Sequence, residues 1–393
     1  MIKIGVVTST RAEFGLLMPV VEQLRKYEDE TFRAELIVAG THLSAAYGRT
    51  VDDIEKSGLR IDHALEIPIN SATAVDISRN QAETLVRFTE FFAAQRYQAV
   101  MILGDRYEML AIAVAAGNTH TPIFHLCGGD TTEGAIDEWI RHSITKMSYL
   151  HFVTNVESRR RVIQLGEAPE RVFNFGSTSI DNILKLANMS KKRALQSLNL
   201  PDVPYAICTY HPVTMEEGGL DRDVADFLAA IRAFPELQFI VTKSNADQGG
   251  ARINALLDAA EKEIDNLHVF FSLGVVRYLS LMKHAAFVLG NSSSGIIETP
   301  AFGIPTVNIG DRQRGRLQSE SILNCNPDTA SIVEAMHKDM CPEFRKVCAA
   351  VVSPYGDGHA VQRIAEKAVA VLRSGEIDLK KKFFDLSIIH GVN

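Results

Sequence analysis

The sequence predicts an α/β protein with two Rossmann-like, doubly wound domains and a central cleft, and three observations support this prediction. The chain has 393 residues, which exceeds the length at which one hydrophobic core keeps growing. Short apolar runs alternate with longer segments of helical period, as in parallel sheets with crossover helices. That alternation pauses once near the middle of the chain and then resumes.

The N-terminal half contains the first series of strands and helices. Its mostly continuous apolar runs are typical of buried parallel strands, and the segments between them are amphipathic. The expected strands are Ile2–Thr8, Ala34–Ala39, Ala99–Leu103, Pro122–His125, His151–Thr154 and Val172–Phe175. The expected helices are Leu16–Lys26, Ala74–Ala94 and Tyr107–Gly117.

A structure-breaking segment separates the two series. Leu200–Pro204 contains two prolines, so we place the domain boundary within residues 185–204, and a nearby hinge fits the pattern equally well. The strands expected in the second series are Tyr205–Thr209, Gln238–Thr242, His268–Phe270, Phe287–Leu289 and Thr306–Ile309. The expected domains are residues 1–190 and 200–358. Residues 359–393, with a final helix at Ala360–Leu372, are expected to form a tail that packs back on the first domain.

The composition is that of an ordinary globular protein. Apolar residues make up 46% of the chain, charged residues make up 23% and the net charge is -7, so we expect neither disorder, nor a nucleic-acid partner, nor a membrane partner. The N-terminus is typical of a first strand rather than a signal peptide. The five cysteines are scattered without CxxC spacing, which favours a reduced, cytoplasmic setting. No HExxH, Walker or GxGxxG motif is present, and neither a metal nor a cofactor is expected.

Ligands of doubly wound folds bind at the carboxyl ends of the strands, so the polar loops there are the candidate sites. In Thr8–Gly15, the backbone amides and Arg11 can face an anion, but a capped turn with a solvated Arg11 explains these residues equally well. In Leu103–Glu108, Asp105 directly follows a buried strand. Asp105 is a candidate catalytic carboxylate, a helix N-cap, or both.

The densest group of carboxylates follows the strand that ends at His125. Gly128 and Gly129 let the backbone pass close to a ligand, and the carboxylates that follow are Asp130, Glu133, Asp137 and Glu138. An acidic first turn favoured by the helix dipole accounts for Asp137 and Glu138 but not for the glycines. Helical spacing also permits an ion pair between Glu138 and Arg141 or His142.

Two loops of the second half complete the candidates. His211 follows the first strand of that half, where a catalytic and a structural histidine are equally consistent with the pattern. The strongest signal is the turn Asn291–Gly295, whose hydroxyls and amides precede an expected helix at Ile296–Ala301 and so favour an anion such as a diphosphate. The candidate nucleotide ligands are Ser292, Ser293, Ser294 and Gly295 in the turn, Glu298 for ribose hydroxyls, and Arg312 and Arg316 for phosphate.

With these loops in place, the chain resembles the hydrolysing UDP-N-acetylglucosamine 2-epimerases of sialic-acid and legionaminic-acid biosynthesis. The matching segments are TSTRAEFG, GTHLSAAYG, ILGDRYE, GGDTTEGAIDEWIRHSITKMS, RVIQLGE, HPVT, GNSSSGIIE, NIGDRQRGR and SPYGDGHA, in the same order over nearly the whole chain. The GDR, IRHSITK, NSSSG and GDRQRGR segments together are specific to this family. The resemblance implies a GT-B-type fold, a nucleotide-sugar substrate and a homo-oligomer, either a dimer or a tetramer.

The resemblance also implies a reaction, the conversion of UDP-N-acetylglucosamine to N-acetylmannosamine and UDP. A base removes the proton from C2 while the nucleoside diphosphate leaves C1, and the resulting 2-acetamidoglucal gains water. Carried over by position, the acid–base set is Asp105, Asp130 and Asp137 with Glu138 beside them, and His211 assists near the departing phosphate. The implied phosphate ligands are Arg11, Ser292, Ser293 and Arg316, and Glu298 binds ribose.

The chain departs from the family pattern on both sides of the Gly-Gly pair, where Cys127 and Asp130 stand at positions that are glutamate in some members. Either the remaining carboxylates suffice, with Glu133 compensating, or the substrate differs. The close alternative is the same chemistry on a UDP- or GDP-linked 2,4-diacetamido-2,4,6-trideoxy sugar. A GT-B glycosyltransferase and a non-catalytic nucleotide-sugar sensor are the more distant alternatives.

Overall fold

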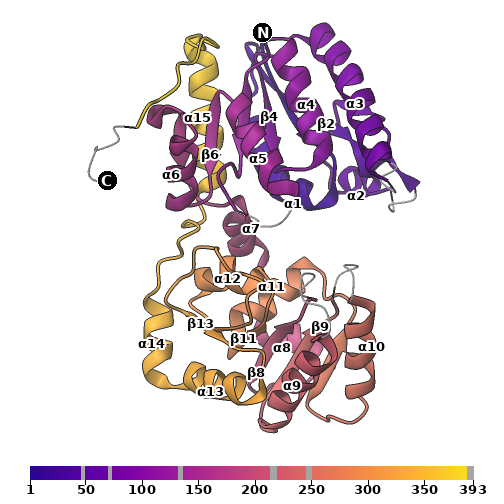
Figure 1. Ribbon diagram of the computed structural model, residues 1–393, viewed down its shortest axis with the longest axis vertical. Coiled ribbons are helices and arrows are strands. Elements are labelled where there is room, and N and C mark those ends of the chain that lie inside the picture. The colour runs from indigo at the N-terminus through magenta and orange to yellow at the C-terminus, as the bar shows by residue number, and fades with distance from the viewer. Residues whose placement is uncertain (46–48, 70–72, 132–135, 213–218, 245–249, 387–393) are drawn as a thin grey trace, which may run out of the picture. The chain divides into compact units, whose positions relative to one another are not determined.

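The chain folds into two compact units, and the sequence of the second interrupts that of the first. Unit 1 comprises Met1–Asp181 and Gly358–Asn393, and unit 2 comprises Asn182–Asp357. The computed structural model describes residues 1–45, 49–69, 73–131, 136–212, 219–244 and 250–386. Figure 1 shows that each unit is a sheet covered by helices.

Unit 1 is built on a parallel sheet whose strand order reverses at β1. Its strands, as far as the structure describes them, are ordered β3-β2-β1-β4-β5-β6-β7. Their bounds are β1 Ile2–Thr8, β2 Phe32–Ala39, β3 His63–Leu65, β4 Ala99–Leu103, β5 Ile123–Leu126, β6 Leu150–Val153 and β7 Val172–Asn174. The chain runs outward from β1 in one direction and from β4 in the other, so the carboxyl ends of these two strands flank the usual ligand position of such a fold.

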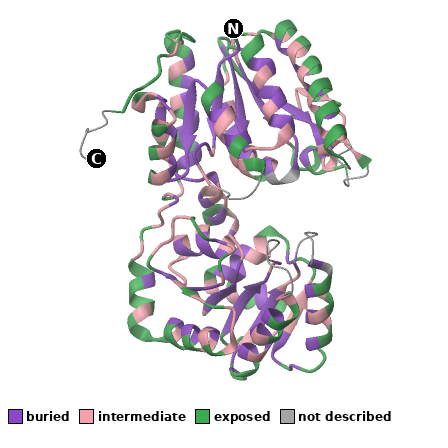
Figure 2. Cartoon of the chain, in the orientation of Figure 1, coloured by how far each residue is buried: buried purple, intermediate pink, exposed green. Residues whose placement is uncertain are grey.

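Helices cover both faces of this sheet because alternate side chains of each strand point to opposite sides. Met101 and Leu103 of β4 pack with one face, together with α1 (Arg11–Arg25), α2 (Val51–Lys56) and α15 (Ala360–Ser374). Val100 and Ile102 pack with the other face, together with α3 (Ala74–Gln95), α4 (Tyr107–Asn118) and α5 (Ile136–Met147). The other helices that the structure describes in unit 1 are η1 Gly40–Leu43, α6 Val156–Gln164, η3 Pro169–Arg171 and the start of α7 Thr178–Leu186, which continues into unit 2. Figure 2 shows the buried strands between helices that are exposed on their outer sides.

The C-terminal segment belongs to unit 1. The carboxylate of Asp181 accepts hydrogen bonds from the first two amides of α15, at 3.1 and 3.0 Å, which satisfies donors that the helix itself leaves unpaired. Beyond α15, Lys381 Nζ donates to Glu167 Oε2 and to the carbonyl of Ser148, both at 2.7 Å. Although burial opposes it, hydrogen bonds from His151, Lys146 and Lys381 lower the pKa of Glu167 to about 2. The tail is therefore anchored by a buried carboxylate.

Unit 2 repeats the architecture. Its described strands form a parallel sheet in the order β10-β9-β8-β11-β12-β13. Their bounds are β8 Tyr205–Thr209, β9 Gln238–Thr242, β10 Leu267–Phe270, β11 Phe287–Gly290, β12 Thr306–Ile309 and β13 Ile322–Cys325. The helices are α8 Lys191–Gln196, α9 Leu220–Arg232, α10 Gly250–Ala260, α11 Val275–His284, α12 Ser294–Ile297, η4 Thr299–Phe302, α13 Thr329–Met340 and α14 Pro342–Ala350. One core joins the sheet to α9, α10 and α13, and another joins it to α8 and α11.

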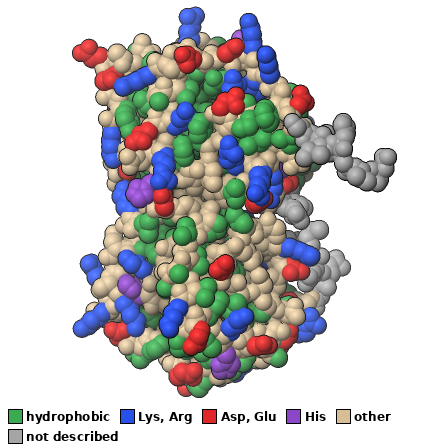
Figure 3. All heavy atoms as spheres, turned by 90° about the vertical axis from the view of Figure 1, so that its left-hand side faces the viewer, with side chains coloured by type: hydrophobic (Ala, Val, Ile, Leu, Met, Phe, Trp, Pro, Cys, Tyr) green, Lys and Arg blue, Asp and Glu red, His purple; other side chains and the backbone are tan. Residues whose placement is uncertain are grey.

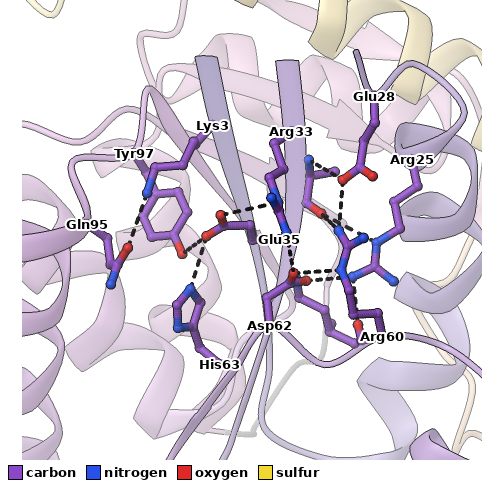
Figure 4. Close-up of polar contacts among 12 residues, drawn as sticks. Lys3, Arg25, Glu28, Arg33, Glu35, Arg60, Asp62, His63, Gln95 and Tyr97 are labelled. Atoms are coloured by element: carbon purple, nitrogen blue, oxygen red, sulfur yellow. Dashed lines mark hydrogen bonds and ion pairs between the residues drawn. The ribbon is translucent and has the colours of Figure 1, made fainter. Parts of the chain in front are cut away.

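Two carboxylates organise the edge of the first sheet, as Figure 4 shows. Asp62, before β3, accepts from Arg25 of α1 at 2.6 Å. Glu35 of β2 accepts from the Tyr97 hydroxyl at 2.7 Å and lies 3.0 Å from His63 Nε2. These contacts attach the short strand β3 to its neighbours through side chains as well as through the backbone.

The prediction of one continuous helix at Ile296–Ala301 is wrong. The structure has a single turn, α12, followed by the 3-10 helix η4. Pro300 lies at the start of η4 and has no N–H group to continue an α-helix. Two edge strands, β3 and β13, were not predicted, because each is short and contains polar residues.

The length and apolar character of the described helices bear on whether they could span a membrane. Within the described ranges, no helix has both the length and the apolar character needed to cross a bilayer. Figure 3 shows basic and acidic side chains interspersed over one face.

Candidate functional site

Arg141 is the centre of a polar cluster at the carboxyl ends of β4 and β5. Its side chain, on α5, is 4% exposed. Its Nε donates to Asp105 Oδ2 at 2.8 Å, and its Nη2 contacts the same oxygen. Its Nη1 donates to the carbonyl oxygen of Asp130 at 2.5 Å and to Glu138 Oε2 at 3.0 Å. One buried guanidinium therefore holds residues from two strand ends and one helix in a fixed arrangement.

Asp105 turns toward Arg141 and not toward the start of α4. The N-cap of α4 is Arg106, and no side chain caps this helix, so the structure excludes the interpretation of Asp105 as a cap. The carbonyl of Gly104, which precedes it, lies 3.0 Å from His125 Nε2. Burial lowers the pKa of His125 to about 3, so the ring is neutral and its Nε2–H donates to this carbonyl.

The first turn of α5 presents the other two carboxylates. Glu138 pairs with Arg141 and also lies 3.1 Å from His142 Nε2, as the helical spacing permits. Asp137 is exposed, but partial desolvation raises its pKa and the charge of Asp105 raises it further, against the opposing charge of Arg141. Asp137, whose pKa is raised, thus lies close enough to Asp105 to feel its charge, an arrangement that acid–base chemistry can use.

The Gly-Gly pair before Asp130 is closely packed against neighbouring elements. A Cβ atom on Gly128 would lie 2.9 Å from Thr145 Oγ1 and 3.0 Å from His125 Nδ1. Gly129 has φ +80°, and its Cβ would lie 2.3 Å from the carbonyl oxygen of Ser158. Both positions therefore need glycine, for reasons of space and, at Gly129, of backbone conformation as well.

Replacing Gly129 by Ala is expected to lower the free energy of unfolding by about 2–4 kcal/mol, because it adds steric overlap to a strained backbone. Gly58 is the matched control, since its φ is +78° and nothing lies within 4 Å of its Cβ position. Gly58→Ala should cost only about 1 kcal/mol, the backbone cost alone. Urea unfolding of both variants measures the difference, and equal losses would contradict the assigned clash.

Asp130 and Cys127, the two residues that depart from the family pattern beside the Gly-Gly pair, differ in their surroundings. The Asp130 carboxylate accepts hydrogen bonds from the hydroxyls of Thr154, at 2.6 Å, and Ser158, at 2.5 Å, which fixes its orientation. Burial and the charges of Asp130 and Asp105 raise the pKa of the Cys127 thiol far above its usual range, so Cys127 is unsuited to carrying protons near neutral pH. Glu133 lies outside the described residues.

The sequence interpretation missed a second acidic pair beside this cluster. Glu13 Oε2 accepts from the backbone amide of Ser9 at 2.8 Å, and Ser9 Oγ donates to Glu108 Oε1 at 2.9 Å. Burial raises the pKa of Glu13 to about 7, and Glu108 is held by Arg106 at 2.6 Å. The Thr10-x-x-Glu13 spacing of a capping box was the available signal, and the structure contains that box. Arg11 is the first residue of α1, and its side chain is outside what the structure describes.

In unit 2, Asn291 connects three loops at the carboxyl ends of β8, β11 and β12. Its Oδ1 accepts from the amide of His211 at 2.7 Å, and its Nδ2 donates to the carbonyl of the same residue at 2.8 Å. Its own carbonyl accepts from Arg312 Nη1 at 3.1 Å and from Gln313 Nε2 at 2.8 Å. The His211 ring lies 3.1 Å from Ser244 Oγ. The fully buried Asn291 thus aligns His211 and Arg312 with the turn Ser292–Gly295, called the serine turn below.

The serine turn itself is partly exposed and leads into the single helical turn of α12. Ser292, Ser293 and Ser294 are half-buried and Gly295 is buried. Gly295 is also required sterically, because a Cβ there would lie 2.8 Å from Thr306 Cγ2. With α12 only one turn long, an anion here would depend on local amides and hydroxyls and not on a helix dipole.

Glu298 ends α12, and Arg316 faces a different part of unit 2. Glu298 Oε2 is buried and has no hydrogen-bond partner among the described residues, and burial raises the pKa of this carboxyl to about 7. Such a group suits an incoming hydroxyl donor. Arg316 lines a cavity toward β13, and no residue of the serine turn lines that cavity. Among the described residues, no group of three or more His, Cys, Asp and Glu side chains is arranged to hold a metal ion.

The two doubly wound units define an α/β protein of the GT-B type, and solved structures support this class. The protein is similar to the UDP-GlcNAc 2-epimerase from Neisseria meningitidis bound to UDP-GlcNAc, with a TM-score of 0.77, 19% sequence identity, and coverage of 94% of this chain and 100% of that one.

The sequence comparisons give the family. The family model described as UDP-N-acetylglucosamine 2-epimerase matches residues 25–368. The chain is 37% identical to the GDP/UDP-N,N'-diacetylbacillosamine 2-epimerase (hydrolyzing) of Campylobacter jejuni over 346 residues, which is 88% of this chain and 89% of that protein. It is 34% identical to polysialic acid biosynthesis protein P7 of Escherichia coli over 385 residues, with coverage of 98% and 97%. The chain belongs to the UDP-N-acetylglucosamine 2-epimerase family, and to its hydrolysing branch.

Proposed function

We propose that this protein is a hydrolysing 2-epimerase that converts a nucleotide-linked 2-acetamido sugar to the free 2-epimer and a nucleoside diphosphate. The observation that carries the proposal is the Arg141 cluster, which holds Asp105 and Glu138 beside Asp137. A reaction that removes a proton from C2 and later returns one needs two carboxylates in different protonation states. The family membership supports the same assignment.

The proposed reaction has two stages. In the first, a carboxylate takes the C2 proton, the C1–O bond breaks and the diphosphate leaves with the bonding electrons, which gives a 2-acetamidoglucal. In the second, water adds its hydroxyl to C1 and a proton reaches C2 from the opposite face. Asp105 and Asp137 form the acid–base pair, and the raised pKa of Asp137 favours its protonated form. Asp130, which is held by two hydroxyls, positions the loop.

Unit 2 supplies the proposed nucleotide ligands. Ser292 and Ser293 with Arg312 would bind the diphosphate, and His211 would lie near the leaving oxygen. The unpartnered Glu298 Oε2 would accept from a ribose hydroxyl. Arg11 and Arg316 remain candidate phosphate ligands on the strength of the motif alone.

We propose a 2,4-diacetamido-2,4,6-trideoxy sugar linked to UDP or GDP as the substrate, with UDP-N-acetylglucosamine as the second candidate. The C. jejuni relative named above acts on GDP/UDP-N,N'-diacetylbacillosamine, as its name states. Cys127 supports a substrate other than UDP-N-acetylglucosamine, since its thiol cannot replace an acidic carboxyl at that position. A glycosyltransferase would share the fold, but it has no need of the Arg141-centred carboxylates.

Turnover in D2O and in oxygen-18 water tests the proposed reaction. Each candidate nucleotide sugar is incubated with the full chain, and the products are analysed by NMR and mass spectrometry. The expected product is the free 2-epimer with deuterium at C2 and oxygen-18 at C1, formed faster from the diacetamido substrate. A free sugar without deuterium at C2 would exclude the elimination, and transfer to an acceptor sugar would favour the glycosyltransferase.

A further inference from the structure

Unit 2 contains a cavity of about 690 Å³ on the side of β12 and β13 that faces α13. Its lining includes Asn308 at the end of β12, Asn324 in β13 and Lys338 in α13 (Figure 1 labels β13 and α13). Arg314 and Arg316 of the loop after β12 complete its basic side. The volume is sufficient for a monosaccharide derivative.

The floor of this cavity is a chain of side-chain amides with one unused acceptor. Asn308 is 2% exposed, its Nδ2 donates to Asn324 Oδ1 at 2.8 Å, and its Oδ1 has no partner among the described residues. Asn324 Nδ2 donates in turn to Gln318 Oε1 at 2.7 Å. A buried acceptor without a donor is costly, and an incoming hydroxyl or amide N–H would satisfy it.

The charges around the cavity favour an anion. Three cationic side chains, Arg314, Arg316 and Lys338, line it, against the two carboxylates Asp311 and Glu334. Asp311 is paired with Arg314 at 3.7 Å, and both are about 80% exposed, so this pair contributes little to the field. The remaining positive charge lies beside amides that suit hydroxyl groups.

The loop after β12 separates this cavity from the serine turn. Arg312 and Gln313 of this loop bind the carbonyl of Asn291, while Arg314 and Arg316 line the cavity. Neighbouring residues of one loop therefore serve two places in unit 2. A ligand in the cavity does not need to displace one at the turn.

We propose that this cavity binds a hydroxylated organic anion of sugar size, either a sugar phosphate or a sugar acid, separately from the nucleotide. The hydroxyls bind the Asn308–Asn324 amides, and the anionic group lies against Lys338. This proposal does not depend on the reaction assigned to the protein.

Ligand-observed NMR titrations of the full chain test the proposal with glucose 6-phosphate, glucuronate and neutral glucose as probes. We expect at least one anion to bind with Kd below about 10 mM and glucose to bind at least about tenfold more weakly. Binding of the phosphate alone or of the carboxylate alone supports the site and identifies its anionic group. No binding of either anion, or equal binding of glucose, overturns it.

Two lining variants and one control locate the binding. Lys338→Met and Asn324→Ala should each weaken the anion about tenfold, as the loss of a charged or satisfied hydrogen bond does. Lys346→Met, an exposed lysine of α14 that does not line the cavity, should leave binding unchanged. Wild-type affinity in both lining variants overturns the proposal.

Adding saturating UDP distinguishes binding in the cavity from binding at the nucleotide site. The NMR signals of the bound anion should persist when UDP is present, and displacement by UDP would place the anion at the nucleotide site and overturn the inference. UDP binding is measured separately in the same samples. Its failure would contradict the proposed nucleotide ligands but not the anion cavity.

Discussion

Replacing Asp105 by Asn is expected to lower kcat by about 100- to 10,000-fold, the range that loss of a general acid or base produces. The amide keeps the shape of the side chain and a hydrogen-bond acceptor for Arg141, but it cannot take a proton. UDP affinity should stay within about twofold of wild type, because the proposed nucleotide ligands other than Arg11 lie in unit 2. Steady-state kinetics and calorimetric titration with UDP measure the two effects.

Asp53→Asn is the matched control for this variant. Asp53 is an exposed residue of α2, and its replacement should leave both kcat and UDP affinity unchanged. If Asp105→Asn instead abolished UDP binding or lowered the melting temperature markedly, the ion pair with Arg141 would be structural. A pH profile of kcat separates the roles further, because loss of an acid–base group removes one limb of the profile.

Replacing Asp339 by Asn is expected to raise the free energy of unfolding by about 2 kcal/mol or more at pH 7.5. Asp339 is fully buried near the C-terminal end of α13, and neither carboxylate oxygen has a partner among the residues described. Burial raises its pKa from 3.8 to about 8, against the opposing charges of Arg345 and Lys338. A negative charge at a helix C-terminus is unfavourable as well.

The pH dependence follows from the direction of this shift. Below pH 3.8 the Asp339 carboxyl is protonated in both the folded and unfolded states, so its contribution to stability is fully present. As the pH rises toward 8, only the unfolded chain ionises, and stability falls by about 1.4 kcal/mol per pH unit. The advantage of Asp339→Asn should therefore be larger at pH 7.5 than at pH 5. A constant advantage across this range in urea unfolding would contradict the raised pKa.

Asp328, at the other end of the same helix, gives a control of opposite sign. Its carboxylate caps α13 by accepting from the amide of Ser331 at 2.9 Å, and that hydrogen bond is the main cause of its lowered pKa. The stability that it contributes is present above its unfolded pKa and is lost as the pH falls through its folded value. Asp328→Ala should therefore destabilise the protein at pH 7.5, and less so in acid.

The strands predicted most accurately are those buried in the middle of the sheets, where both faces of the strand are covered. β1, β4, β8, β9 and β12 match the expected ranges residue for residue, because buried parallel strands are continuous apolar runs with clear ends. β3 and β13 lie at sheet edges, where one side is unpaired and polar residues are tolerated. Their short patterns carry no periodic signal of their own.

The candidate site was predictable in its residues but not in its contacts. Chain position places Asp105 after β4 and Glu138 in the first turn of α5, and helical spacing gives the pair of Glu138 with Arg141. The choice of Asp105 between a helix cap and an ion pair depends on where Arg141 points, which only the packing of α5 decides. The hydroxyls that hold Asp130 come from residues more than 20 positions away, so no local pattern reveals them.

The connectivity of unit 1 has a consequence for biosynthesis on the ribosome. Unit 2 is one uninterrupted stretch, Asn182–Asp357, whereas the core of unit 1 includes α15, which is synthesised only after the whole of unit 2. While unit 2 is synthesised and can fold, the apolar face of unit 1 that α15 later covers stays exposed in the nascent chain. This order reverses the usual one, in which the N-terminal domain is completed first. Premature termination just before α15 would therefore leave unit 2 complete and unit 1 with exposed apolar surface.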